Sequence, residues 1–343
     1  MNWRIAAVPA TLIPIFIIAL QFDISPEDIL AIGLLPFAAA VVVMMLKLIL
    51  QGIKFTYITR QYLGKFDSFW KLTGVRVGSE FIKFTTPMFV GAEFVVIYYL
   101  HRKGVKPSKS TWIAIMDIVT EVLAAGILSI MAGVLALASG AYVVATVVLG
   151  TSITVTALWV VLFFLSSKRT FQIPQGLAAL ASKLGKEKGA KYVEQTNSWM
   201  AEVCMMSRKN LRTAESKRVF TVALLFSIAS WICYGITFMI ISAGTEYVIG
   251  AFDSIMAVMG ANAIGNLPIT VGGSGLAEFG IVAYIHNLNP FDFDASAGGL
   301  AAWDAVIGWR IATYYIPIVV TWLLLVKLAL SRISKTETSS SGA

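Results

Sequence analysis

Ionisable side chains inside long apolar stretches are the first feature of this sequence that could do chemistry. Asp117 and Glu121 lie four residues apart, so on a helix they share one face. Two carboxylates this close repel each other unless a cation or a shared proton lies between them. The pair is therefore a candidate for proton coupling, and the candidate cations for it among the intramembrane charges are Arg76, Lys83 and Arg310.

A second group, Arg76, Glu80 and Lys83, follows helical spacing of four and three residues. Side chains at this spacing lie on one helix face. One interpretation is an internal ladder of ion pairs. The other is an entrance that binds the phosphate of a lipid, because arginine suits bidentate contact with an anion. The sequence leaves both open.

Glu93 and Glu278 occupy equivalent places in two similar strings. The first runs Pro87-Met-Phe-Val-Gly91-Ala-Glu93-Phe, and the second runs Pro268-Ile-Thr-Val-Gly272-Gly273-Ser-Gly275-Leu-Ala-Glu278-Phe. Both glutamates are candidates for proton coupling or for contact with an amine on a substrate, and the simpler alternative is that each caps a half-helix. Arg310, isolated among apolar residues, is the strongest candidate for anion binding, and a simple charge pair is its alternative. The expected substrate-binding set is Arg76, Lys83, Glu93, Glu278 and Arg310.

The two strings also predict interruptions of the helices. Proline removes a backbone donor and glycine permits turns that a Cβ would block. Free backbone groups at membrane depth are tolerated only against protein or a water-filled cavity, and half-helix N-termini attract anions. The residues expected to break the helices are Pro87, Gly91, Pro268, Gly272, Gly273 and Gly275.

The elements that must position these residues are membrane spans. Of the 343 residues, 57% are hydrophobic and 13% are charged, and the mean hydropathy is +0.78, whereas soluble domains carry about 25% charged residues. Charge-free stretches at about 5–20, 29–46, 122–167 and 219–243 reach the length that crosses a bilayer, and 122–167 fits two spans that meet near Gly140. We expect residues 1–343 to form a single all-α polytopic transmembrane domain, with the first stretch retained as a span.

The distribution of lysine and arginine predicts the topology. None occurs between Arg4 and Lys47, between Lys109 and Lys168, or between Arg218 and Arg310, whereas residues 47–109 and 168–218 hold eleven each. By the positive-inside rule the basic stretches and both termini face the cytoplasm. The cell membrane is the expected location.

Combined with this topology, the two strings predict an inverted repeat. The first lies between cytoplasmic charges and the second between outward ones, so each is expected to be a re-entrant pair of half-helices entering from opposite sides. Repeat one covers about 29–138 and repeat two about 219–328. An ordinary kinked helix is the alternative at each break.

Residues 168–218 carry a net charge of +7 and predict a cytoplasmic basic helical hairpin beside anionic lipid headgroups. Membrane lipids are the expected partners, and apolar spans also suit a homo-oligomer. No nucleic-acid motif accompanies the basic residues, and no spacing of Cys or His predicts a metal or cofactor. Residues 334–343, rich in serine, are expected to be a disordered tail.

Several stretches across nearly the whole chain resemble a known family. They are Arg76 through Pro87, Gly91-Ala-Glu93, Tyr98-Tyr-Leu100, Asp117 with Glu121, Leu267-Pro268 with Gly272-Gly273, Gly275 and Glu278, and Arg310-Ile-Ala-Thr-Tyr-Tyr-Ile-Pro317. Together they resemble the transmembrane-region family of lysyl-phosphatidylglycerol synthetase, the flippase part of bacterial multiple peptide resistance factors. The third span departs from the family, which often has Glu-Arg before a later Asp where this chain has Asp117-Ile118 and then Glu121.

The resemblance implies a lipid-translocating module with Glu93, Glu278 and Arg310 at motif positions. The synthetase needs a separate soluble domain, which these 343 residues do not contain, so we expect a stand-alone member that is no enzyme. The leading hypothesis is a flippase-like transporter that moves an anionic or polyprenyl-phosphate-type lipid between leaflets. The alternatives are a secondary transporter of a small anion or ion and an integral-membrane enzyme that acts on a lipid carrier.

Overall fold

The chain is an all-α polytopic membrane protein, as predicted. The computed structural model describes residues 26–86, 91–245, 247–267, 270, 273–286 and 300–340. Within these ranges every regular element is a helix, and five helices are long and apolar enough to cross a membrane. The first predicted span, about 5–20, lies outside the described residues.

The long helices follow a short α2 (Pro26–Ala31). They are α3 (Leu34–Leu63), α6 (Pro107–Ala138), α7 (Tyr142–Lys168) and α9 (Ala214–Ser242), and a last span made of α12 (Leu300–Arg310), the π-helical turn η1 (Ile311–Tyr315) and α13 (Ile316–Ser340). The 30 residues of α3 extend ~45 Å at ~1.5 Å per residue, enough to cross ~30 Å of hydrocarbon. The turn between α6 and α7 contains Gly140 at φ +84°, so the two predicted spans meet where expected.

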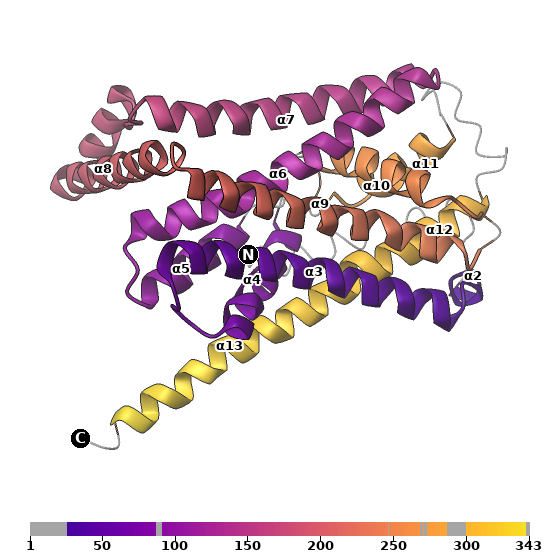
Figure 1. Cartoon of the computed structure of the whole chain (residues 1–343), viewed down its shortest axis with the longest axis horizontal. Helices are drawn as coiled ribbons and strands as arrows, with labels where there is room; N and C mark the ends of the chain where they lie inside the picture. The colour runs from indigo at the N-terminus through magenta and orange to yellow at the C-terminus, as the bar shows by residue number, and fades with distance from the viewer. Residues whose placement is uncertain are drawn as a thin grey trace.

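Four shorter helices form the two broken pairs. They are α4 (Phe69–Phe84) with α5 (Ala92–Arg102), and α10 (Ala251–Gly265) with α11 (Leu276–Ile285). The longest, α4, has 16 residues and extends only ~24 Å, so none of the four crosses the hydrocarbon alone. Both breaks fall at the predicted strings. Figure 1 places α4 and α5 toward the end that carries α8, and α10 and α11 toward the end that carries α2. This placement agrees with an inverted repeat, whose symmetry itself remains a prediction.

Helix packing brings α3, α4, α6 and α9 together around one region. α3 packs along α9, α4 packs on α3 and α13, and α6 packs on α7 and α9. The approach of α3 to α4 depends on Gly52, where a Cβ would lie 2.6 Å from Cγ2 and 2.9 Å from the carbonyl oxygen of Thr73. Because the two backbones come this close, polar faces on the two helices can share partners.

The loop between α3 and α4 is held by Asp67. Its carboxylate accepts a 2.6 Å hydrogen bond from the Tyr99 hydroxyl and lies 3.1 Å from Lys103 Nζ. Burial acts to raise the pKa of Asp67, but the hydrogen bonds from Tyr99 and from the Ser68 backbone N–H, together with Lys103, hold it below the ordinary value. The loop is therefore fixed to α5 at neutral pH.

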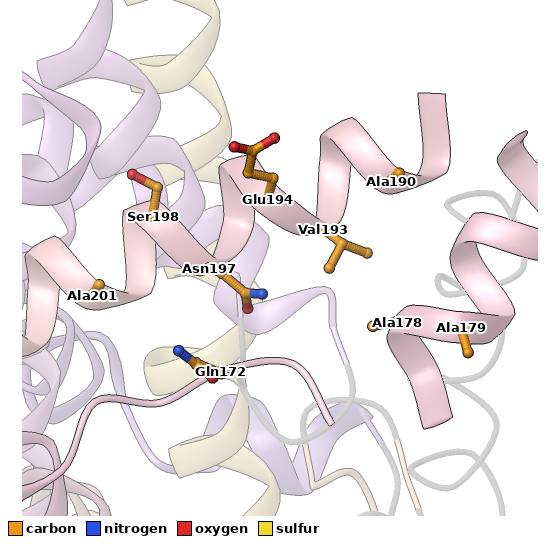
Figure 2. Close-up of a pocket in the computed structure, with 9 residues that line it drawn as sticks. All are labelled: Gln172, Ala178, Ala179, Ala190, Val193, Glu194, Asn197, Ser198 and Ala201. Atoms are coloured by element: carbon orange, nitrogen blue, oxygen red, sulfur yellow. The ribbon is translucent and has the colours of Figure 1, made fainter. Parts of the chain in front are cut away.

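The helix α8 (Gln175–Asn210) folds back on itself within the predicted hairpin region. Figure 2 shows Ala178 and Ala179 on a segment that faces Ala190 and Val193, with a cavity of about 670 Å³ between them. Four of the nine described lining residues are alanine, and Glu194 is the one ionisable side chain among the nine. These described residues therefore form no cluster of charges that could do chemistry.

The last helix, α13, is helical through Ser340. The disordered tail expected over 334–343 stays a prediction. The helix continues because residues 329–340 contain neither glycine nor proline, the residues that break helices most strongly. The last three residues lie outside the described part of the chain.

Candidate functional site

Arg76 of α4 is the centre of a buried ion network. Its Nε lies 2.7 Å from Asp117 Oδ2, its Nη2 lies 2.8 Å from Glu121 Oε2, and its Nη1 pairs with Glu80 one helical turn away. The residue is 1% exposed. Because all three guanidinium nitrogens already contact carboxylates, these contacts favour the internal ladder over the phosphate-binding interpretation.

Lys54 of α3 completes the neutralisation of the acidic pair. Its Nζ lies 3.0 Å from Asp117 Oδ1 and donates to the Asp117 carbonyl oxygen at 2.9 Å and to Ser227 Oγ at 3.2 Å. Two cations from two different helices therefore approach Asp117. The cations that offset the repulsion between Asp117 and Glu121 are therefore Lys54, Arg76 and Lys83. Arg310 pairs with Glu278 instead.

Lys83 lies at the last turn of α4 and differs from Arg76 in its access. Its Nζ pairs with Glu121 and lies 3.8 Å from Glu80 Oε2, while its side chain is 15% exposed. That exposed part faces a cavity of about 340 Å³. Lys83 therefore connects the buried network to an open space within the bundle.

The cavity joins the ends of the broken helices to the long spans. Its volume falls at the low end of the ~300–1,000 Å³ typical of ligand pockets. Charged side chains line one part, neutral polar side chains another, and apolar side chains of α6 and α7 a third. The charged members are Lys47, Glu80, Lys83, Glu93 and Glu121, the neutral polar ones include Ser129, Ser152, Asn262 and Asn266, and the apolar ones include Ile118, Val122, Val155, Leu158 and Leu162.

Lys47 of α3 is the member of this site that sequence reasoning missed. It is 4% exposed, and its Nζ lies 5.1 Å from the ring centroid of Trp231 and 5.0 Å from that of Tyr234. Among the described residues no carboxylate lies within 4.0 Å of it. The charge count had used Lys47 and Lys54 as cytoplasmic markers, but both lie buried within the bundle. One sequence feature could have identified them: Lys47, Gln51 and Lys54 are spaced by four and three residues, the same spacing as Arg76, Glu80 and Lys83.

Glu93 and Glu278 both begin half-helices, as the simpler interpretation predicted. Glu93 Oε2 accepts the backbone N–H of Gly91 at 3.1 Å, and Glu278 Oε2 accepts that of Gly275 at 2.8 Å. The two glycines have φ of +129° and +85°, a region that L side chains rarely adopt. Glu93 also lines the cavity, so it can contact a molecule bound there as well as cap α5.

Glu278 has a second partner, Arg310. Arg310 Nε lies 2.7 Å from Glu278 Oε1, and its guanidinium carbon lies 3.9 Å from the ring centroid of Tyr314. Both charged residues are buried, and neither lines the cavity. The Tyr314 hydroxyl donates to the Phe84 carbonyl oxygen at 2.7 Å, which ties the last span to the end of α4. The five predicted binding residues therefore fall into three places. Lys83 and Glu93 line the cavity, Arg76 lies within the buried ion network, and Glu278 with Arg310 lies outside both.

The predicted helix-breaking residues are only partly described. Gly273, like Gly91 and Gly275, has a positive φ, and a Cβ there would lie 2.9 Å from the Gly265 carbonyl oxygen. Pro87, Pro268 and Gly272 lie outside the described residues. Over the described ranges, no group of three His, Cys, Asp or Glu side chains could hold a metal ion.

The Glu278–Arg310 pair makes a stability prediction. We expect Glu278→Gln to lower the free energy of unfolding by about 3–5 kcal/mol, because the amide can still cap α11 but leaves a buried guanidinium without its carboxylate. The double variant Glu278→Gln/Arg310→Gln should recover part of this loss, since no charge is left uncompensated. Thermal unfolding in detergent measures both.

Glu93→Gln is the matched control, because Glu93 caps α5 in the same manner but has no cation within 4.0 Å among the described residues. It should cost no more than a helix cap, about 1 kcal/mol. Losses that simply add in the Glu278/Arg310 double variant would contradict a coupled pair.

Comparison with known proteins identifies the family of the chain. A family model described as the lysylphosphatidylglycerol synthase TM region matches residues 8–321. No curated protein matches the chain. Since the family match covers all the helices that build the cavity and the buried ion network, the chain belongs to the family of lysylphosphatidylglycerol synthase transmembrane regions.

Proposed function

We propose that this protein is a flippase-like transporter that moves an anionic or polyprenyl-phosphate-type lipid between the leaflets of the cell membrane. The observation that carries the proposal is Lys47, a buried cation beside the cavity without a carboxylate partner among the described residues. A buried charge without a counter-ion is costly, and an anionic headgroup that enters the cavity would supply one. Family membership supports a role with membrane lipids.

The apolar wall of the cavity suits a lipid rather than a free anion. Val155, Leu158 and Leu162 of α7 line the cavity and are also 37%, 57% and 42% exposed on the molecule. A small cavity beside such a wall can accept a headgroup while the acyl or polyprenyl chains remain in the bilayer. In this proposal Lys47 and Lys83 hold the phosphate, and Glu93, Asp117 and Glu121 are the candidates for proton coupling.

The orientation follows from the charge distribution. We place both termini and α8 in the cytoplasm, with basic side chains of the hairpin such as Lys188 and Lys191 beside anionic headgroups. Translocation needs no bond to be made or broken, so the proposal includes no enzyme activity.

Reconstitution tests the proposal. The purified full chain is placed in vesicles that contain acyl-labelled phosphatidylglycerol or a labelled polyprenyl phosphate, and a reductant that cannot cross the bilayer reports the label in the outer leaflet. We expect transfer between leaflets to be faster than in protein-free vesicles. No acceleration for any phospholipid or polyprenyl phosphate would contradict the proposal. Uptake of a free anion without lipid transfer would indicate the small-anion transporter instead.

A further inference from the structure

One part of the cavity carries polar groups but no charge. Asn262 and Asn266 lie in the last turn and at the end of α10, and Ser152 comes from α7. Lys83 and Glu93 instead flank the break between α4 and α5. The pair α4 and α5 lies toward the end that carries α8, and the pair α10 and α11 toward the end that carries α2 (Figure 1). Residues beside both breaks line the same cavity, with charged side chains beside the first break and neutral polar ones beside the second.

The neutral part has unused hydrogen-bonding capacity. Ser152 is 6% exposed and its Oγ has no hydrogen-bond partner within the described chain. Hydroxyls in a helix usually donate to a carbonyl one turn back, as Thr151 does to Val147 at 2.8 Å, and Ser152 does not. A buried hydroxyl left unpaired at membrane depth costs free energy.

Asn262 and Asn266 add two amides to the same wall. Both are partly exposed and line the cavity, and neither side chain has a hydrogen bond to another described residue. Each amide offers two N–H donors and one carbonyl acceptor. A partner that complements this wall must both donate and accept hydrogen bonds, which is what a hydroxyl group does. An ammonium group, which only donates, would leave the amide donors unpaired.

We infer that Ser152, Asn262 and Asn266 form a subsite for the uncharged, hydroxyl-bearing part of a lipid headgroup, a glycerol or a sugar attached through a phosphodiester. The inference rests on the proposed function, in which Lys47 and Lys83 bind the phosphate. The headgroup then lies across the cavity, with its phosphate in the cationic part and its hydroxyls in the neutral part.

A selectivity ratio tests the subsite. Vesicles containing the full-length protein carry, in separate preparations, acyl-labelled phosphatidylglycerol, phosphatidylinositol, phosphatidic acid or phosphatidylethanolamine. We expect the wild type to transfer the glycerol and inositol lipids about tenfold faster than phosphatidic acid, the effect of one or two net hydrogen bonds. The Asn262→Ala/Asn266→Ala and Ser152→Ala variants should bring the ratio close to one while the rate for phosphatidic acid changes less than about twofold. Each ratio compares the transfer rates of two lipids with the same batch of purified protein, so it does not depend on the fraction of that protein that folds.

Thr146→Val on α7 is the matched control, because its hydroxyl is exposed and donates to the Tyr142 carbonyl oxygen at 2.7 Å away from the cavity. It should leave the ratio unchanged.

An unaltered ratio in the Asn262/Asn266 and Ser152 variants would overturn the subsite and assign the amides to bound water. Phosphatidylethanolamine moving as fast as phosphatidylglycerol would also overturn it and point to Glu93 as an ammonium site. Absence of transfer for all four lipids would instead count against the proposed function.

Discussion

We expect Arg76→Met to lower the free energy of unfolding by about 3–5 kcal/mol, enough to prevent accumulation of folded protein. Methionine removes the guanidinium that contacts Glu80, Asp117 and Glu121, and leaves carboxylates of α4 and α6 buried together. Unlike a surface ion pair, this contact is buried, so bulk solvent does not compensate the lost cation. Yield after size-exclusion chromatography and thermal unfolding in detergent measure the effect.

Arg102→Met provides the comparison. Arg102 is exposed, and its guanidinium carbon lies 6.0 Å from the ring centroid of Tyr98, so its loss should change stability by no more than about 1 kcal/mol. Adding Glu121→Gln to Arg76→Met should restore part of the stability, because it removes one of the uncompensated charges. A folded, wild-type-like Arg76→Met protein would show that the network does not hold α4 on α6.

The second large effect concerns transport rather than folding. We expect Lys47→Met to slow lipid transfer about ten- to hundredfold, the effect of losing one charge-assisted contact to a phosphate worth roughly 1.5–3 kcal/mol. Stability should stay the same or rise, because methionine fills a similar volume against Trp231 and Tyr234 and removes a buried charge that has no carboxylate partner in the described chain. Transfer rates and thermal unfolding are measured on the same reconstituted preparations.

Lys54→Met is the comparison for Lys47→Met, because Lys54 is the other buried lysine of α3 and pairs with a carboxylate. Lys54 pairs with Asp117 at 3.0 Å and is 0% exposed, so its replacement should destabilise the fold. Opposite signs of the stability change for Lys47 and Lys54 would support a binding role for the first and a structural role for the second. Wild-type transfer by Lys47→Met would refute the proposed phosphate contact.

The helical architecture and both breaks were predictable because they depend on short-range chemistry. An apolar run of sufficient length is a span in almost any context, and a Pro/Gly string interrupts a helix wherever it occurs. The simpler interpretation of Glu93 and Glu278 as caps was also correct, since a carboxylate two or three residues after a glycine reaches that glycine's own N–H. These interactions lie within one segment of chain.

The roles of the basic residues were less predictable. Lys47 and Lys54 look like the flanking charges of a span, and counting them as topology markers hid their place in the site. Arg76 and Lys83 lie two turns apart on one face of α4, yet the first is enclosed by carboxylates and the second reaches the cavity. Arg310 was one of three candidate cations for the acidic pair of α6 and the strongest candidate for anion binding, and it contacts Glu278.

The sequence by itself determined a polytopic helical protein with two broken segments, a basic region and a small set of intramembrane charges. Only the tertiary structure decided which charge faces which, because that depends on the rotation and depth of helices far apart in the chain. α3 approaches α4 closely at Gly52, Lys54 of α3 pairs with Asp117 of α6, and Trp231 and Tyr234 of α9 lie beside Lys47. Hydropathy cannot report such contacts, because it assigns the same value to a lysine in water and to a lysine enclosed by aromatic rings.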